Sequence, residues 1–202
     1  MAGNYKKWNS SKESNNNNNL HVVLFISRNK DNKDVEGFKE RRKSFVSSKS
    51  TEELMEDFNI FCSKGVDLET CRFYISFNAR DRVKTNKELV HYLIDNPEIP
   101  TEDIPAIITA IAARKEQAAE YNWMFDFDDK DENRCNDFCD KIYEIEPIAS
   151  LKKYKTPNGF HIITNSHFDT RELLKEFPNA TLKRDDLTLV KVFTKGVCIN
   201  EE

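Results

Sequence analysis

Glycine is scarce in this sequence, at 5 of 202 residues, and neither a G-x-G-x-x-G nor a G-x-x-x-x-G-K-[ST] pattern occurs. Such loops need glycine where the backbone approaches a phosphate, so the common Gly-rich nucleotide loops are excluded. Long apolar runs are also missing, since none approaches the roughly 20 residues of a membrane-spanning helix. No apolar segment precedes a cleavage site near the N-terminus, so the sequence predicts neither a membrane segment nor secretion.

Cysteine is present but follows no structural pattern. The five cysteines are an odd number, and no C-x-x-C occurs, which argues against a disulfide framework and against a zinc ribbon. Cys135 and Cys139 are one helical turn apart and share an apolar stripe with Phe138 and Ile142, so we expect them in the core. A reducing cytoplasm is the compartment that such cysteine usage predicts.

Charge is unevenly distributed along the chain. The formal net charge is −4, but residues 85–146 alone carry 6 basic and 16 acidic side chains. The first 19 residues include an unbroken run of five asparagines, which predicts a disordered tail. The 14 phenylalanines are too many for a solvated chain, so residues 20–202 are expected to form a single folded domain.

The order of the predicted elements indicates the fold class. A basic helix is expected over residues 35–48, and further helices over 51–63 and 101–120. Antiparallel strands dominate the second half, where Asn158-Gly159 supplies a tight hairpin turn. The prediction is therefore an α/β (α+β) domain, with one mixed, largely antiparallel sheet and flanking helices.

The segment Asp126-Phe127-Asp128 is the strongest chemical signal in the sequence. Because a strand has a period of two residues, both carboxylates project from one face, and Phe127 packs on the other. Two adjacent carboxylates repel each other unless a cation lies between them, and Mg²⁺ or Mn²⁺ prefers such oxygen ligands. The simpler alternative is a strand end that meets solvent.

Two later segments add to this signal. Gly159 and His161 open an apolar strand, and Asp185-Asp186 precedes another strand. In this order, the three motifs resemble the archaeo-eukaryotic primase superfamily, including the small primase–polymerase domains of phage and mobile elements. The resemblance covers about residues 122–190. It implies a primase-like catalytic core in which Asp126, Asp128 and Asp185 are metal-binding acids, with Asp186 as the alternative third acid.

The resemblance also implies a function and its partners. The chain would be a nucleotidyltransferase that uses two divalent metals, Mg²⁺ or Mn²⁺, to bind NTP or dNTP and transfer nucleotides, with DNA or RNA as the second partner. His161 would contact a phosphate of the nucleotide. Further contacts to the triphosphate are expected from cationic and polar side chains near the predicted site, namely Arg80, Arg82, Lys155 and Asn158.

Two alternatives stay open at this point. Thr156, Pro157 and Asn158 stand where the primase pattern has a serine and a basic residue, and no zinc-binding module is visible. A catalytically inactive primase-like binding or accessory protein of a phage or mobile element is therefore the second hypothesis. A Mg²⁺-dependent phosphatase of haloacid-dehalogenase type is the third, with Asp126 as nucleophile and Asp128 as acid/base.

Overall fold

The computed structural model describes residues 19–196. The predicted tail, apart from Asn19, lies outside the described residues, as does Cys198. The chain divides into two compact units, which we call unit 1 (residues 19–75, 80–117 and 189–196) and unit 2 (residues 76–79 and 118–188). The mixed α/β class is confirmed, although the structure has two antiparallel sheets where the sequence analysis expected one. The chain passes between the units four times, and the expectation of a single domain stays a prediction.

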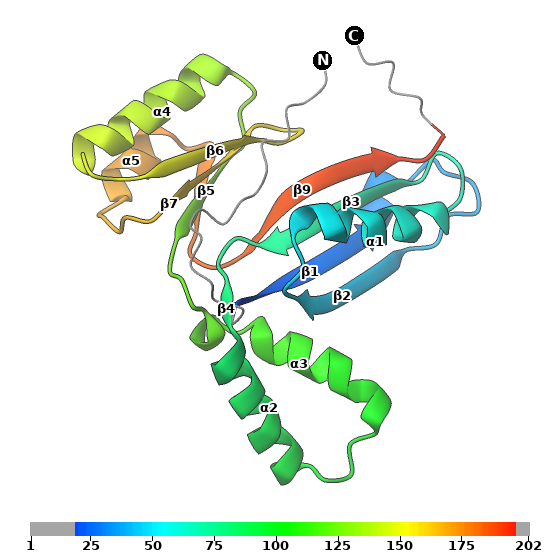
Figure 1. Ribbon diagram of the computed structural model, residues 1–202. Coiled ribbons are helices and arrows are strands. Elements are labelled where there is room, and N and C mark those ends of the chain that lie inside the picture. Colours follow the sequence, from blue (N-terminus) through cyan, green and yellow to red (C-terminus); the bar gives the residue numbers. More distant parts are fainter. Residues whose placement is uncertain (1–18, 197–202) are drawn as a thin grey trace. The chain divides into compact units, whose positions relative to one another are not determined.

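Unit 1 is built on a five-stranded sheet in the order β2-β1-β3-β9, with the short β4 paired to β1. The strands are β1 (Asn19–Ser27), β2 (Arg41–Ser47), β3 (Thr70–Ser76), β4 (Arg80–Asp81) and β9 (Leu187–Thr194), whose first two residues belong to unit 2. Helix α1 (Thr51–Ser63) lies along one face of this sheet (Figure 1). Its apolar side and the sheet enclose a core of aromatic rings, including Phe25, Phe58 and Phe73.

Helix α1 begins where the sequence predicts. The Ser50 side chain accepts a hydrogen bond from the backbone N–H of Glu53, and the Glu53 carboxylate accepts one from the backbone N–H of Ser50. This reciprocal capping box satisfies two N–H groups that the first turn would otherwise leave unpaired. The buried side chains Leu54 and Phe58 follow at helical spacing.

The predicted basic helix over residues 35–48 is wrong. Residues 41–47 form strand β2, which pairs antiparallel with β1, so that Phe45 faces Val23 and Lys43 faces Phe25. Gly37 has a φ of +72°, a conformation that interrupts a right-handed helix. The charged residues concealed the β-forming segment Ser44-Phe45-Val46, and β1 gains its edge partner from it.

Two helices that follow β4 complete unit 1. The helices α2 (Arg82–Asp95) and α3 (Ile104–Ala112) pack on each other. The single helix expected over residues 101–120 is shorter in the structure, because the 3₁₀ helices η2 (Thr101–Asp103) and η3 (Lys115–Gln117) flank α3. A third 3₁₀ helix, η1 (Asn29–Asp31), follows β1.

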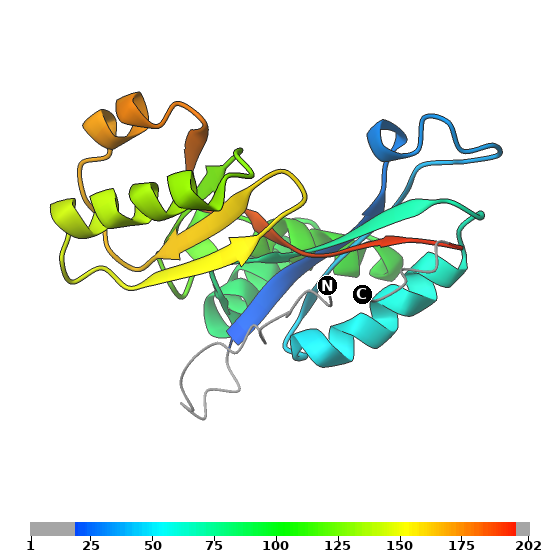
Figure 2. The ribbon, with the colours of Figure 1, turned by 90° about the horizontal axis from the view of Figure 1, so that it is seen from above.

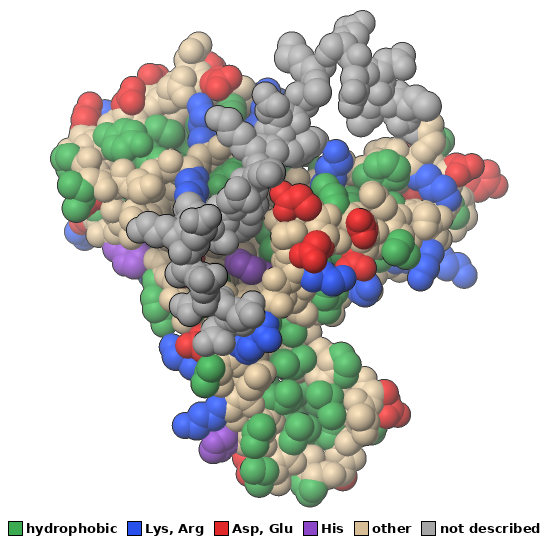
Figure 3. All heavy atoms as spheres, in the orientation of Figure 1, with side chains coloured by type: hydrophobic (Ala, Val, Ile, Leu, Met, Phe, Trp, Pro, Cys, Tyr) green, Lys and Arg blue, Asp and Glu red, His purple; other side chains and the backbone are tan. Residues whose placement is uncertain are grey.

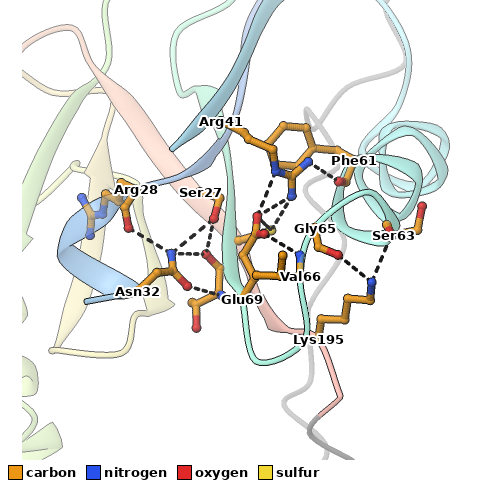
Figure 4. Close-up of polar contacts among 12 residues, drawn as sticks. Ser27, Arg28, Asn32, Arg41, Phe61, Ser63, Gly65, Val66, Glu69 and Lys195 are labelled. Carbon is orange, nitrogen blue, oxygen red and sulfur yellow. Dashed lines mark hydrogen bonds and ion pairs between the residues drawn. The ribbon is translucent and has the colours of Figure 1, made fainter. Parts of the chain in front are cut away.

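A buried polar cluster ties the elements of unit 1 together (Figure 4). The Glu69 side chain is only 2% exposed, and its carboxylate accepts hydrogen bonds from the Arg41 guanidinium and from the backbone N–H of Val66. Arg41 also donates to the carbonyl of Phe61 at the end of α1, at 2.9 Å. Lys195 donates to the carbonyl of Gly65 at 2.6 Å. A buried carboxylate is therefore paired, as its desolvation requires.

Unit 2 consists of a β-α-β-β-α-β segment that closes its own sheet. Its elements are β5 (Trp123–Phe127), α4 (Glu132–Ile145), β6 (Leu151–Lys155), β7 (Phe160–Thr164), α5 (Arg171–Glu176) and β8 (Ala180–Lys183). The strand order is β6-β7-β5-β8, and every neighbouring pair is antiparallel. This is the split β-α-β arrangement of ferredoxin-like domains. Both helices lie on the same face of the sheet (Figure 2).

Successive side chains along each strand of unit 2 point to opposite faces of the sheet, so one face forms the core and the other does not. Phe125 and Phe127 point to the helices and pack against Phe138 of α4 and Phe177, with ring centroids 5.2–6.3 Å apart. Cys135 is fully buried in this core, with Cys139 packed against it, as predicted. Residues 124 and 126 alternate with these phenylalanines and belong to the other face, which we call the helix-free face of unit 2.

Candidate functional site

A row of polar side chains crosses the helix-free face of unit 2. Asp126 on β5 is directly opposite His161 on β7, and His161 is opposite Tyr154 on β6. On the other side, Asp126 is opposite Thr181 on β8. Directly opposed residues of antiparallel strands project from the same face. The pairing therefore brings two of the predicted site residues, Asp126 and His161, together at the middle of the sheet.

Both ring nitrogens of His161 have protein neighbours. Its Nε2 lies 3.4 Å from Oδ1 of Asp126, and its Nδ1 lies 2.8 Å from Oγ1 of Thr188. In the neutral ring that donates from Nε2 to the carboxylate, Nδ1 accepts a hydrogen bond from the Thr188 hydroxyl. The His161 side chain is only 10% exposed. The ring is thus fixed in orientation from both sides.

The Asp126 carboxyl is held in its charged form. The hydrogen bond with His161 lowers the pKa of Asp126 more than its partial burial raises it, and the charge of Lys183 lowers the pKa further. The Asp126 side chain keeps 33% of its surface exposed. A partly exposed, ionised carboxylate on a rigid strand is able to bind a cation or to accept a hydrogen bond from a ligand.

Gly159 brings the β6–β7 turn against the end of β5. A Cβ atom at residue 159 would lie 1.9 Å from the carbonyl oxygen of Phe127 and 2.7 Å from the backbone nitrogen of Asp129. The turn is closed by hydrogen bonds between Thr156 and Gly159. Glycine is therefore required here by the close backbone approach, and it sets the position of the His161 strand beside the acidic strand end.

The remaining predicted acids occupy different places in unit 2. Asp128 is the first residue after β5, and its side chain is exposed. Its backbone N–H donates a hydrogen bond to the carbonyl of Asn179. Asp185 is half-buried in the β8–β9 connection, whereas Asp186 is exposed and lies 3.8 Å from Lys183. Within residues 19–196, no three His, Cys, Asp or Glu side chains are grouped so that they could hold a metal ion. Metal binding by these acids therefore stays a prediction.

The predicted triphosphate contacts belong to different elements and to both units. Lys155 is opposite the core residue Phe160, so it is at a position of the core face. Tyr154 and His161 are at positions of the helix-free face. Asn158 is exposed in the hairpin turn. Arg80, which is 2% exposed, and Arg82 belong to unit 1, whereas Asp126 and His161 belong to unit 2. Contact of these four residues with a nucleotide stays a prediction.

Sequence reasoning missed part of the polar row. The sequence analysis does not name Thr188, although its hydroxyl fixes His161. It also does not name Lys183, which lies opposite Met124 on the helix-free face. The charge of Lys183 was visible in the sequence. The contact of Thr188 depends on how the chain beyond β8 returns to β7, 27 residues away, and no local pattern encodes it.

None of the helices between residues 19 and 196 is long and apolar enough to cross a membrane. Comparisons with protein-family models, with curated proteins and with solved structures give no match to this chain.

Proposed function

We propose that unit 2 is a primase-like nucleotidyltransferase module that binds a nucleoside triphosphate on its helix-free face. One observation carries the proposal: the DxD strand and the G-x-H strand are neighbours, with Asp126 directly opposite His161 on the face that the helices leave uncovered. The topology supports it, because a central strand of such a sheet can present acids and a histidine on a rigid surface.

The divalent metal of the proposal, Mg²⁺ or Mn²⁺, would be held by Asp126 and Asp128 together with oxygens of the triphosphate, because Asp185 is not grouped with them as a third ligand. Mg²⁺ in proteins is commonly held by one or two carboxylates together with substrate phosphates. Bound there, it would neutralise charge on the triphosphate. The protein's own part is to keep Asp126 ionised and to keep the His161 ring in place through Thr188. DNA or RNA is the proposed second substrate, and the cytoplasm is the proposed location.

Calorimetric titration of the full chain with a nucleoside triphosphate and Mn²⁺ tests the proposal. We expect metal-dependent binding that is lost in the Asp126→Asn, Asp128→Asn double variant. Asp137→Asn is the matched control, since Asp137 is an exposed acid on α4, which covers the opposite face. Absence of binding by the wild-type chain, or equal binding by the double variant, would refute the proposal. Primer extension with labelled nucleotide then tests transfer.

Binding without catalysis is the second candidate, and the surroundings of His161 favour it. Both ring nitrogens already face Asp126 and Thr188, so the ring needs no phosphate to satisfy them. This candidate predicts metal-dependent triphosphate binding with no incorporation of nucleotide. A phosphatase substrate in the same assay tests the third hypothesis, in which Asp126 is a nucleophile.

A further inference from the structure

The two ring nitrogens of His161 have unequal surroundings. Nδ1 lies 2.8 Å from Oγ1 of Thr188, a normal hydrogen-bond distance, whereas Nε2 lies 3.4 Å from Oδ1 of Asp126, which is longer than a typical hydrogen bond. The exposure of the two partners differs in the same sense, since Thr188 is 3% exposed and the Asp126 side chain is 33% exposed. The ring is therefore closed in on its Thr188 side and open on its Asp126 side.

The Asp126 carboxylate decides which nitrogen of the neutral ring carries the hydrogen. An ionised carboxylate can only accept hydrogen bonds, so the nitrogen that faces it, Nε2, carries the N–H. Nδ1 then has no hydrogen and accepts a hydrogen bond from the Thr188 hydroxyl. The single N–H of the His161 ring is thus on the open side, where another acceptor can take the place of the carboxylate.

The segment that carries Thr188 is itself anchored within unit 2. Thr188 is the second residue of β9, directly after the β8–β9 connection. In that connection, the carbonyl of Asp186 accepts a hydrogen bond from the backbone N–H of Phe77, and the carbonyl of Arg184 accepts one from the Asn78 side chain. Both donors belong to the first segment of unit 2. The Thr188 hydroxyl is therefore held in place independently of His161.

The hydroxyl at residue 188 matters more than the volume of the side chain. The His161 side chain is only 10% exposed, and a buried nitrogen that loses its hydrogen-bond partner costs free energy. Rotation of the ring about its Cβ–Cγ bond, which would take Nε2 away from Asp126, is opposed by the hydrogen bond at Nδ1. Without the Thr188 hydroxyl, the ring would keep only its long contact with Asp126.

We propose that Thr188 is a positioning residue for triphosphate binding: it holds His161 with the N–H on the open side, where a phosphate oxygen replaces the Asp126 carboxylate as the acceptor. This inference rests on the proposed function, since it names the hydrogen bond that the triphosphate gains from the ring. The exchange gives up only the long contact and leaves the Thr188 hydrogen bond unchanged. A hydrogen bond to a charged phosphate is stronger than one between neutral groups.

Heteronuclear NMR of the histidine ring nitrogens in the full chain tests the hydrogen bond without any ligand. The chain has 4 histidines, and histidine takes up little of the surface visible in Figure 3. The His161 signals are assigned by their absence from the His161→Gln variant. We expect Thr188→Val to shift the Nδ1 signal and Thr188→Ser to keep it, since serine retains the hydroxyl. Thr70→Val is the matched control, because Thr70 makes a side-chain hydrogen bond from a strand of unit 1.

Calorimetric titration with a nucleoside triphosphate and Mg²⁺ measures the consequence for binding. We expect Thr188→Val to weaken triphosphate binding by about tenfold, the effect of losing one well-placed hydrogen bond. Thr188→Ser and Thr70→Val should bind like the wild type. In the NMR spectrum of the wild-type chain, bound triphosphate should shift the Nε2 signal of His161 and leave the Nδ1 signal in place.

The outcomes separate this inference from the proposed function. An Nδ1 signal that is the same in the wild type and in Thr188→Val would overturn the role of Thr188. So would equal triphosphate binding by these two chains, with circular dichroism confirming that the variant is folded, and in both cases the proposed function would stand. A wild-type chain that binds no triphosphate would refute the proposed function and this inference with it.

Discussion

The turn at Gly159 shows how much one missing side chain contributes to the candidate site. The β6–β7 hairpin reaches the end of β5 only because no Cβ separates residue 159 from the backbone of Phe127 and Asp129. The same approach sets His161 opposite Asp126. The Asn-Gly pair predicted the turn from the sequence, but the close approach to β5 is a tertiary contact that the turn pattern does not contain.

Gly159→Ala is expected to destabilise the chain by about 3 kcal/mol, because the new methyl group meets backbone atoms that have little room to move. Urea unfolding followed by circular dichroism measures the loss. Asn158→Ala is the control, since Asn158 is an exposed neighbour in the same turn, and it should cost much less. Equal stability of Gly159→Ala and the wild type would contradict the packing described for this turn.

Asp31 makes folding stability depend on pH. Burial raises the pKa of this carboxyl, but hydrogen bonds from Arg72 and Arg28 outweigh burial and lower the pKa to about 2. Because the folded pKa lies below the unfolded one, the stabilisation is complete above about pH 4 and is lost as the pH falls toward 2.

Asp31→Asn should therefore cost about 2 kcal/mol at pH 7 and progressively less at pH 4 and below. Urea midpoints across this pH range provide the measurement. An Asp34→Asn variant is the comparison, because Asp34 is a nearby exposed acid. A loss for Asp31→Asn that is the same at pH 7 and pH 2.5 would show that the ion pairs are not its cause.

At the scale of elements, the sequence predicts best those helices and turns whose signals are local. Apolar residues at helical spacing predicted α1, and Asn158-Gly159 predicted the β6–β7 hairpin. Strand β2 was not predicted, because its charged residues mask the alternation of apolar and polar residues that indicates a strand. That this segment forms a strand depends on its pairing with β1. The candidate site shows the same difference. The strands that carry the DxD and G-x-H motifs could be predicted from local patterns. The contact of Thr188 with His161 could not, because it joins residues that are 27 positions apart in the sequence.

The capping box of α1 gives a prediction for an element. Ser50→Ala removes the acceptor of the Glu53 N–H and should reduce the free energy of unfolding by about 1 kcal/mol. Ser48→Ala is the matched control, since this exposed serine precedes the helix. Thermal or urea unfolding measures both variants, and similar small losses for the two would argue against a contribution from the cap.

At the scale of the whole molecule, the two units share the chain in an interleaved order. Unit 1 gains β9 only after all of unit 2, and the second residue of β9, Thr188, fixes His161. Each unit has its own aromatic core. We expect the two units to unfold together, because loss of unit 1 releases β9 and with it the contact between Thr188 and His161.

Phe58→Ala tests this coupling. Phe58 is buried in the core of unit 1, and its truncation should cost about 3–5 kcal/mol. Hydrogen exchange measured by mass spectrometry in increasing urea should then show protection lost at the same lowered urea concentration in β3 of unit 1 and β7 of unit 2. Unchanged protection of β7 would mean that unit 2 is stable on its own.

Strand β2 also affects the association of this protein with other protein molecules. It is the outermost strand of the unit 1 sheet, and it presents the exposed cations Arg42 and Lys43. A strand of another molecule that hydrogen-bonded to this edge would have to approach a row of positive charge, which discourages open-ended stacking into fibrils. The segment that the sequence analysis interpreted as a helix therefore protects the edge of this sheet from aggregation.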